Sequence, residues 1–378
     1  MDISADQEKL KDDDVAYLLG KRVVGLLLPI LVTMLFVSWS VLNLSGLYAG
    51  QHQSPLFVVM NEDNQKSVGE KIGSSVLNAF IFVGCITLIT FLIVILYKCH
   101  CKFILFAWML LSVTFVLFAM LWVWLDLICT RFQIPYDIIT VVFLLWNVVV
   151  VGVISIFYYS HLVLAQVYFV VSSIVMAWLL TFIPEWTTWS LLVCISIYDV
   201  LAVLCPYGPL RLLINTSISR NEPIPALVYS TSDEAELARA KKNRRELEEE
   251  EEMCTNDDAH AGKKNNSNAQ RSAKISPASR FYNSLMGLPF KLGLGDIVFF
   301  SLLTGKTIPY AFMPWVMSIV AVLIGLIGTL VNLLLFKSEN RALPALPISV
   351  FCGVVVVFLS YFLIIPLDWF ATTSMLAL

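Results

Sequence analysis

The sequence has little charge and few of the residues that build metal sites. Only 14% of its 378 residues are Asp, Glu, Lys or Arg, whereas 58% are hydrophobic, which is far from the average of soluble proteins. Its four His residues are scattered, and its eight Cys residues lack the paired spacing of a disulfide framework or a zinc site. The net charge of −3 leaves no basic surface for nucleic acid. The composition therefore indicates a membrane protein that holds no metal and needs no cofactor.

Nine apolar segments are long enough, or nearly so, to cross a membrane. A hydrocarbon core about 30 Å thick needs about 20 apolar residues in a helix. The predicted spans are 23–44, 76–97, 103–125, 138–158, 161–183, 186–205, 290–308, 314–336 and 343–366. The predicted fold is thus an all-α integral membrane protein with nine transmembrane helices.

The spans divide the chain into five parts. An acidic tail at 1–22 has no basic segment of the kind that opens a cleavable signal peptide, so the first span is expected to act as a signal anchor. Transmembrane helices one to six fill 23–205. A polar stretch at 206–289, rich in Asn, Ser, Lys and Glu, is predicted to be a largely disordered loop. Helices seven to nine follow at 290–366, and 367–378 forms a tail.

Basic residues indicate the direction of insertion, because Lys and Arg resist translocation. With the N-terminus in the cytosol, 21 of the 25 Lys and Arg residues lie on the cytosolic side. The long loop between spans six and seven is then cytosolic, and the odd number of spans places the C-terminus in the lumen.

Two carboxylates lie inside predicted spans, where an ionised group is costly. Asp199 precedes the Pro206 that stops the sixth span by seven residues, or about 10 Å of helix. Asp296 follows Lys291 at the start of the seventh span by five residues, or about 8 Å. Antiparallel neighbouring helices would therefore hold the two carboxyl groups at the same depth. Gly293 and Gly295 would allow a bend or the close approach of another backbone, such as a substrate strand.

Paired carboxyl groups favour aspartic protease chemistry. Two like charges a few ångströms apart resist ionising together, so one group can take a proton from water while the other polarises a peptide carbonyl. The same residues are also compatible with a proton or ion pathway, or with a structural hydrogen-bonding role. The residues alone leave these alternatives open.

Three motifs carry a resemblance to a known family. They are Tyr198-Asp199 followed by LAVLCPYGPLR at 201–211, KLGLGD at 291–296, and ALPALP at 342–347. In these residues, in this order around a long loop, the chain closely resembles the presenilin family, which comprises the catalytic subunits of γ-secretase and belongs to the GxGD intramembrane aspartyl proteases. The resemblance extends over essentially the whole membrane domain.

The resemblance assigns roles to individual residues. It implies that Asp199 and Asp296 are the catalytic pair. It implies that the surrounding motifs support the active site through Tyr198, Gly293, Leu294, Gly295, Pro344, Ala345 and Leu346. The last three form the PAL motif. Two prolines three residues apart, at 344 and 347, can prevent a regular helix there, but the residues alone favour the alternative of an ordinary span start.

Two further segments follow from the resemblance. Trp146 and Asn147 match a position that contacts the presenilin enhancer protein in the family, although Val148 stands where the family usually has an aromatic residue. Self-cleavage before Asp296 is also implied. Its predicted segment is Phe281, Tyr282, Asn283, Ser284, Leu285, Met286, Gly287 and Leu288.

The resemblance implies an intramembrane endopeptidase that cuts single-span proteins, such as Notch-like receptors and amyloid-precursor-like proteins. It also implies three partners: nicastrin, the anterior-pharynx-defective protein and the presenilin enhancer protein. The expected location is the membrane of the endoplasmic reticulum and Golgi apparatus, and also the plasma membrane and endosomes. The alternatives are a protease of the signal-peptide-peptidase type with the opposite topology, and an ion-leak or transport pathway through the same aspartates.

Overall fold

The computed structural model describes residues 3–48, 68–99, 101–158, 162–204, 228–230, 291–335, 345–364 and 366–367. Most of these residues are helical. The α-helices of four or more residues are α1 (Ile3–Tyr48), α2 (Val68–Lys98), α3 (Lys102–Phe115), α4 (Leu121–Phe132), α5 (Ile138–Phe157), α6 (Leu162–Leu180), α7 (Glu185–Leu204), α12 (Leu294–Thr307), α13 (Phe312–Leu335) and α14 (Ala345–Leu359). Two π-helical turns, η2 (Val116–Met120) and η3 (Ser360–Ile364), join α3 to α4 and extend α14.

Two short strands are the exception to an all-helical fold within the described ranges. β1 (Val228–Ser230) and β2 (Lys291–Gly293) form a two-stranded sheet. β2 occupies the first residues of the predicted seventh span, so α12 begins at Leu294 rather than at residue 290. Gly293 still has extended backbone angles, φ −68° and ψ 142°, so it is the last residue of the strand and the cap of the helix that begins at Leu294.

The chain divides into two units by its internal packing. One unit holds residues 1–29 and 228–292, and the other holds 30–227 and 293–378. The division within α1 follows Pro29, whose ring removes one backbone hydrogen bond from the helix interior. Nearly all of the residues discussed below belong to the second unit.

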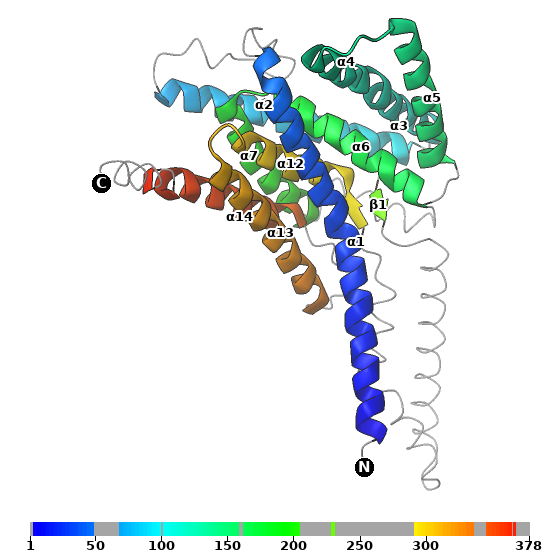
Figure 1. Ribbon diagram of the computed structural model, residues 1–378, viewed down its shortest axis with the longest axis vertical. Coiled ribbons are helices and arrows are strands. Elements are labelled where there is room, and N and C mark those ends of the chain that lie inside the picture. Colours follow the sequence, from blue (N-terminus) through cyan, green and yellow to red (C-terminus); the bar gives the residue numbers. More distant parts are fainter. Residues whose placement is uncertain are drawn as a thin grey trace. The chain divides into compact units, whose positions relative to one another are not determined.

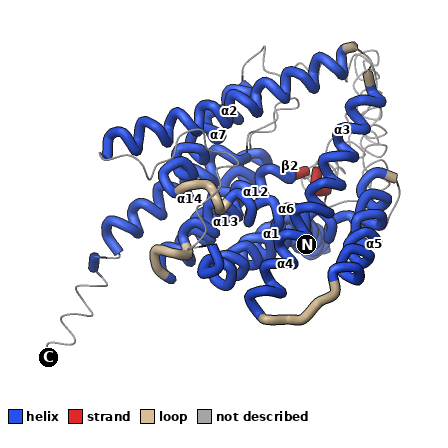
Figure 2. Tube along the Cα trace, turned by 90° about the horizontal axis from the view of Figure 1, so that it is seen from above, coloured by secondary structure: helices blue, strands red, loops and turns tan. Residues whose placement is uncertain are grey.

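Within the second unit, the aspartate-bearing helices lie among other helices. α7 packs along α2 and α14, while α12 packs against α6, α13, α14 and α7 (Figure 1, Figure 2). α13 and α14 lie side by side along much of their lengths. A second group is formed by α3, η2, α5 and α6, around buried Val113, Leu117 and Val149.

Glycines allow several of these helices to approach closely. A Cβ added to Gly325 of α13 would lie 2.7 Å from the Ser349 Cα of α14, and one added to Gly353 of α14 would lie 3.0 Å from Leu303 of α12. Such small-residue contacts are typical of helices packed in membranes, where the water-driven hydrophobic effect does not hold helices together.

Hydrogen bonds tie the part of α1 in this unit to its neighbours. The Trp315 indole of α13 donates to Ser38 Oγ at 2.9 Å, and the Trp124 indole of α4 donates to Ser40 Oγ at 3.2 Å. Polar groups paired across helices avoid the cost of an unsatisfied donor in an apolar medium.

Six of the described helical segments are long and apolar enough to cross a membrane. They are Val23–Leu47, Gly69–Lys98, Phe103–Phe132, Ile138–Phe157, Val163–Leu180 and Phe312–Asn332, and a shorter apolar helix runs over Pro347–Leu363. They coincide with predicted spans one to five and eight, and the shorter helix with span nine. The two helices that carry Asp199 and Asp296 fall outside this set. The chain is thus a multi-pass membrane protein, while the count of nine spans stays a prediction.

Candidate active site

Asp199 lies on α7, five residues before the end of the helix. α7 begins after Pro184, which disfavours a helical conformation at the preceding residue, and it carries Glu185 in its first turn, where a negative charge suits the helix dipole. Asp199 is half-buried. The packing of α2 on one side of the helix and α14 on another fixes the position of its backbone.

Tyr198 is held by a hydrogen bond between helices. Its hydroxyl group lies 3.1 Å from Thr90 Oγ1 of α2, and either atom can donate. Thr90 Oγ1 also lies 2.8 Å from the Thr87 carbonyl oxygen, to which it donates. The contact therefore links the residue next to Asp199 to a neighbouring helix and restrains rotation of α7 about its axis.

Asp296 is the third helical residue of α12 and caps the start of its own helix. Its carboxylate accepts a hydrogen bond from the Gly293 backbone N–H. This is half of a capping box, in which an acidic side chain at the third position reaches back to the backbone N–H of the capping residue. The bond fixes the carboxyl group at the junction of β2 and α12. The residues that follow, Ile297 and Val298, are buried and anchor the helix.

The two carboxyl groups are brought together. α7 and α12 are in direct contact, and Asp199 and Asp296 are close enough to interact electrostatically. Both residues are half-buried. An acid and a base at one place, between packed helices, can together activate water and polarise a carbonyl group.

The glycines before Asp296 provide space rather than unusual backbone angles. No described glycine has a positive φ. Among the described residues, a Cβ added to Gly295 would meet only Phe299, at 4.0 Å, and one added to Gly293 would lie 3.5 Å from Asp296 Oδ2. Packing within the chain therefore does not demand glycine at residue 295, where the surface is exposed.

The PAL motif lies at the start of α14. Pro344 is outside the described residues, and α14 begins at Ala345, followed by Leu346. Pro347 lies inside the first helical turn, which agrees with the ordinary span start that the residues alone favour. Backbone N–H groups of that turn have no intrahelical partner, so proline is tolerated there.

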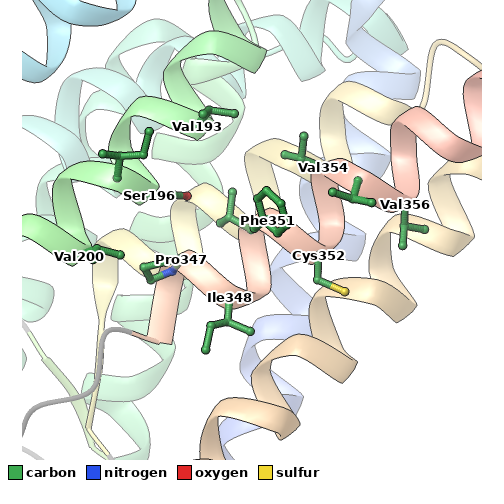
Figure 3. Close-up of a pocket in the computed structure, with 12 residues that line it drawn as sticks. Val193, Ser196, Val200, Pro347, Ile348, Phe351, Cys352, Val354 and Val356 are labelled. Carbon is green, nitrogen blue, oxygen red and sulfur yellow. The ribbon is translucent and has the colours of Figure 1, made fainter.

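An apolar groove of about 600 Å³ runs between α7 and α14 (Figure 3). Val193, Ser196 and Val200 line it from α7, and Pro347, Ile348 and Phe351 are among the residues that line it from α14. Ser196 Oγ donates to the Leu192 carbonyl oxygen at 2.9 Å, so the one lining hydroxyl is satisfied within its own helix. The groove reaches Val200, which follows Asp199 in sequence, and Pro347, which follows the PAL motif.

The other predicted residues lie elsewhere. Trp146 is 59% exposed on α5, next to the exposed Asn147, whose Nδ2 donates to the Phe143 carbonyl oxygen at 2.8 Å. This face is free to contact lipid or another protein. The predicted self-cleavage segment, residues 281–288, lies outside the described residues.

Two features of the site were missed by reasoning from the sequence. One is Thr90, whose partner Tyr198 is 108 positions away, so no local pattern marks it. The other is the groove, because its valines and isoleucines are indistinguishable in sequence from residues that face lipid. Both depend on which helices pack together.

Comparisons with known proteins identify the family of the chain. A family model described as Presenilin matches residues 18–289 and 285–367. Presenilin-B of Dictyostelium discoideum is 33% identical over 92% of this chain and 64% of its own length, so the chain spans less than two thirds of that relative. A presenilin-like protein of Arabidopsis thaliana is 33% identical over 92% of this chain and 93% of its own. A presenilin of Caenorhabditis elegans is 30% identical over 92% and 87%. The matched residues include both aspartates and the PAL motif, and the chain belongs to the presenilin family.

Proposed function

We propose that this protein is an intramembrane aspartyl endopeptidase that cuts single-span membrane proteins within their membrane segments, with Asp199 and Asp296 as the catalytic pair. Family membership supports a presenilin-type intramembrane protease function. The observation that carries the assignment of residues is the meeting of two half-buried carboxyl groups between packed helices.

The proposed reaction needs only water and the two carboxyl groups. The ionised carboxylate takes a proton from water, while the protonated carboxyl group donates a hydrogen bond to the carbonyl oxygen of the scissile peptide. The water oxygen attacks the carbonyl carbon and gives a tetrahedral intermediate. The carbon–nitrogen bond then breaks as the amine receives a proton, and the products are a new carboxyl terminus and a new amino terminus.

Substrate must present an unwound peptide, because the carbonyl groups of a helix are already hydrogen-bonded. We propose that a substrate segment adds as a strand to β2 (Lys291–Gly293), which directly precedes Leu294, Gly295 and Asp296. Strand addition supplies backbone hydrogen bonds, and the open space at Gly295 leaves room for a second backbone. The apolar groove beside Val200 also supports binding of a substrate segment here, because it offers an apolar surface next to Asp199.

The finer parts of the proposal rest on the family. They are a nine-span topology with the N-terminus and long loop in the cytosol, a location in endoplasmic reticulum and Golgi membranes, and self-cleavage within residues 281–288. A complex with nicastrin, the anterior-pharynx-defective protein and the presenilin enhancer protein belongs to the same set. The exposed Trp146 and Asn147 are available for the last of these contacts.

The test compares three isosteric substitutions in cells that lack the endogenous enzyme. Asp199→Asn and Asp296→Asn keep the size of the side chain and remove its acid–base chemistry. Asp137→Asn is the matched control, because Asp137 caps α5 by accepting from the Thr140 N–H at 3.1 Å and Asn caps helices equally well. One blot follows loop cleavage and the release of a fragment from a single-span substrate.

Both products are expected with the wild type and with Asp137→Asn, and neither with the other two variants. If Asp199→Asn or Asp296→Asn cleaves as well as the wild type, the pair is not the active site. Ion flux that depends on Asp199 without any proteolysis would instead support a transport pathway.

A further inference from the structure

A second cavity lies at the opposite end of the helix that carries Asp199. It is small, about 130 Å³, and it is lined at the start of α7, by Tyr310 in the turn after α12, and by residues of α14 and η3. Glu185 at its wall is fourteen residues from Asp199 along α7, which is about 21 Å of helix. This cavity is therefore separate from the carboxyl pair and takes no part in the proposed reaction.

The walls of the cavity are mostly aromatic. Six of its eight lining residues carry rings, namely Trp186, Trp189, Tyr310, Phe358, Tyr361 and Phe362. We call these six residues with Glu185 the aromatic cage. A volume of about 130 Å³ is roughly ten times the space that one water molecule needs, so the cage can hold a small chemical group.

Some ring pairs of the cage are steeply inclined and others are nearly parallel. The centroids of Tyr310 and Tyr361 are 5.2 Å apart with planes inclined at 67°, and those of Tyr361 and Phe362 are 5.4 Å apart at 89°. Trp189 and Phe358 are 5.5 Å apart at 59°. Two other pairs are stacked: Trp189 and Tyr310 at 18° with centroids 6.5 Å apart, and Phe358 and Phe362 at 17° with centroids 6.4 Å apart. The three inclined pairs place ring surfaces on more than one side of the space.

The polar groups of the cage are already engaged. The Tyr310 hydroxyl donates to a Glu185 carboxylate oxygen and accepts from the Trp189 indole at 3.2 Å. Burial, and then the bond to Glu185, raises the pKa of Tyr310 above its ordinary value, so the hydroxyl stays neutral. The nearby cation, Lys306, donates to the Ile183 carbonyl oxygen and does not line the cavity.

This combination matches one class of ligand. The faces of aromatic rings and a single carboxylate attract a positive charge. A primary ammonium group needs several hydrogen-bond acceptors, whereas a quaternary ammonium group donates no hydrogen bond and needs only aromatic faces and negative charge. With Glu185 accepting from Tyr310, the cage suits the quaternary group better.

The position of the cage favours a lipid as the source. Trp186 is 45% exposed at the start of α7, and Tyr361 and Phe362 are 46% and 67% exposed at the end of the apolar helix Pro347–Leu363. Tryptophan and tyrosine gather at this level in membrane proteins, where lipid headgroups lie. We propose that the aromatic cage binds the choline headgroup of phosphatidylcholine at the membrane surface remote from the two aspartates.

The test measures lipid preference with the purified full-length protein. The protein is placed in nanodiscs of phosphatidylethanolamine and titrated with phosphatidylcholine of the same acyl chains, and the lipid retained is counted by native mass spectrometry. The two lipids differ only in having a primary or a quaternary ammonium group. We expect the wild type to retain phosphatidylcholine about tenfold in preference, from the strength of partly desolvated cation–π contacts.

Substitutions locate the preference. Trp186→Ala and Glu185→Gln should each lower it several-fold, whereas Tyr361→Phe keeps the aromatic face and should preserve it. Trp108→Ala is the control, because Trp108 is 55% exposed on α3 and lines neither cavity. The thermal unfolding midpoint of each variant in pure phosphatidylethanolamine shows whether it is folded.

Three results would overturn the proposal. They are equal retention of the two lipids by the wild type, an equal loss of preference in Trp108→Ala, and a full preference in Trp186→Ala. Binding of choline chloride to the cage together with equal retention of the two lipids would place the ligand in solution and overturn the lipid assignment. The Asp199→Asn variant should keep the preference, so the result does not depend on proteolytic activity.

Discussion

α12 and α5 differ sharply in what surrounds them. Nine of the fourteen residues of α12 are buried, including Ser301, Thr304 and Thr307, whereas only four of the twenty residues of α5 are buried. α5 is long enough to cross a membrane and exposes large hydrophobic residues along much of its surface, while α12 is too short to span about 30 Å alone. The helix that faces lipid has the sequence of a membrane span, and the helix that carries Asp296 has the sequence of a protein interior.

The surroundings of the two helices determine how each responds when a side chain is shortened. A side chain on α5 that is shortened leaves space that lipid chains can fill, but one on α12 leaves a cavity between helices. Two of the buried hydroxyl groups on α12 are paired: Thr304 Oγ1 donates to the Ser301 carbonyl oxygen at 3.0 Å, and Thr307 Oγ1 lies 3.1 Å from Ser318 Oγ of α13. Ser301 Oγ is buried without a hydrogen-bond partner among the described residues. α12 is therefore held by its contacts rather than by the membrane, which gives Asp296 a fixed position.

The largest effect is expected when a leucine of α12 is shortened to alanine, and the same change in α5 is the comparison. Leu303 of α12 is fully buried and packs against Gly353 of α14, whereas Leu144 of α5 is 55% exposed. Leu303→Ala should lower the free energy of unfolding by about 2–5 kcal/mol, because it opens a cavity. Leu144→Ala should change it by less than about 0.5 kcal/mol. Chemical unfolding in nanodiscs measures both, and equal losses would mean that α5 is as enclosed as α12.

A second pair of substitutions contrasts a crowded glycine with an open one. A Cβ added to Gly152 of α5 would lie 2.7 Å from Tyr168 Cε1, so Gly152→Ala should destabilise the fold by about 1–3 kcal/mol. Gly295→Ala should leave stability equal or raise it by about 0.5–1 kcal/mol, since alanine is the better helix former and space is available.

The same Gly295→Ala variant tests strand addition. If another backbone must approach there, it should cleave substrate more slowly although it is stable. Unfolding curves and cleavage rates are measured on one preparation. A stable Gly295→Ala enzyme with unchanged cleavage would remove the argument for close approach of a substrate at this residue.

The sequence predicted where the two aspartates lie, but fewer of the helix boundaries and contacts that hold them in place. The depth of Asp199 and Asp296 below predicted span ends placed the two carboxyl groups together, because helical rise converts residue number into distance. The start of α12 was misplaced by four residues, since hydropathy does not distinguish an extended Lys291–Gly293 from the first turn of a helix. For the PAL segment the residues alone favoured an ordinary span start over an irregular one, and residues 345–347 form the first turn of α14, where proline is compatible with a helix.

Contacts between distant helices could not be predicted. Hydropathy reports the average preference of a segment for an apolar environment, and lipid and protein interiors satisfy it equally. The groove between α7 and α14 and the aromatic cage near Glu185 both arise where two such faces meet. No periodic pattern in one segment identifies its partner.

The smallest effect concerns the bond that orients Tyr198. Tyr198→Phe removes the contact with Thr90 Oγ1 at 3.1 Å and leaves the ring, so cleavage should slow by about three- to tenfold, as expected for loss of a hydrogen bond of about 0.5–1.5 kcal/mol. Thr90→Val should slow cleavage equally, because it removes the other partner of the same hydrogen bond, although Thr90 lies on α2 and far from the aspartates in sequence. The double variant should be no slower than either single one, because all three remove one interaction. Cleavage rates that multiply in the double variant would show that Tyr198 and Thr90 act independently. In that case the link between α2 and α7 would not be what positions Asp199.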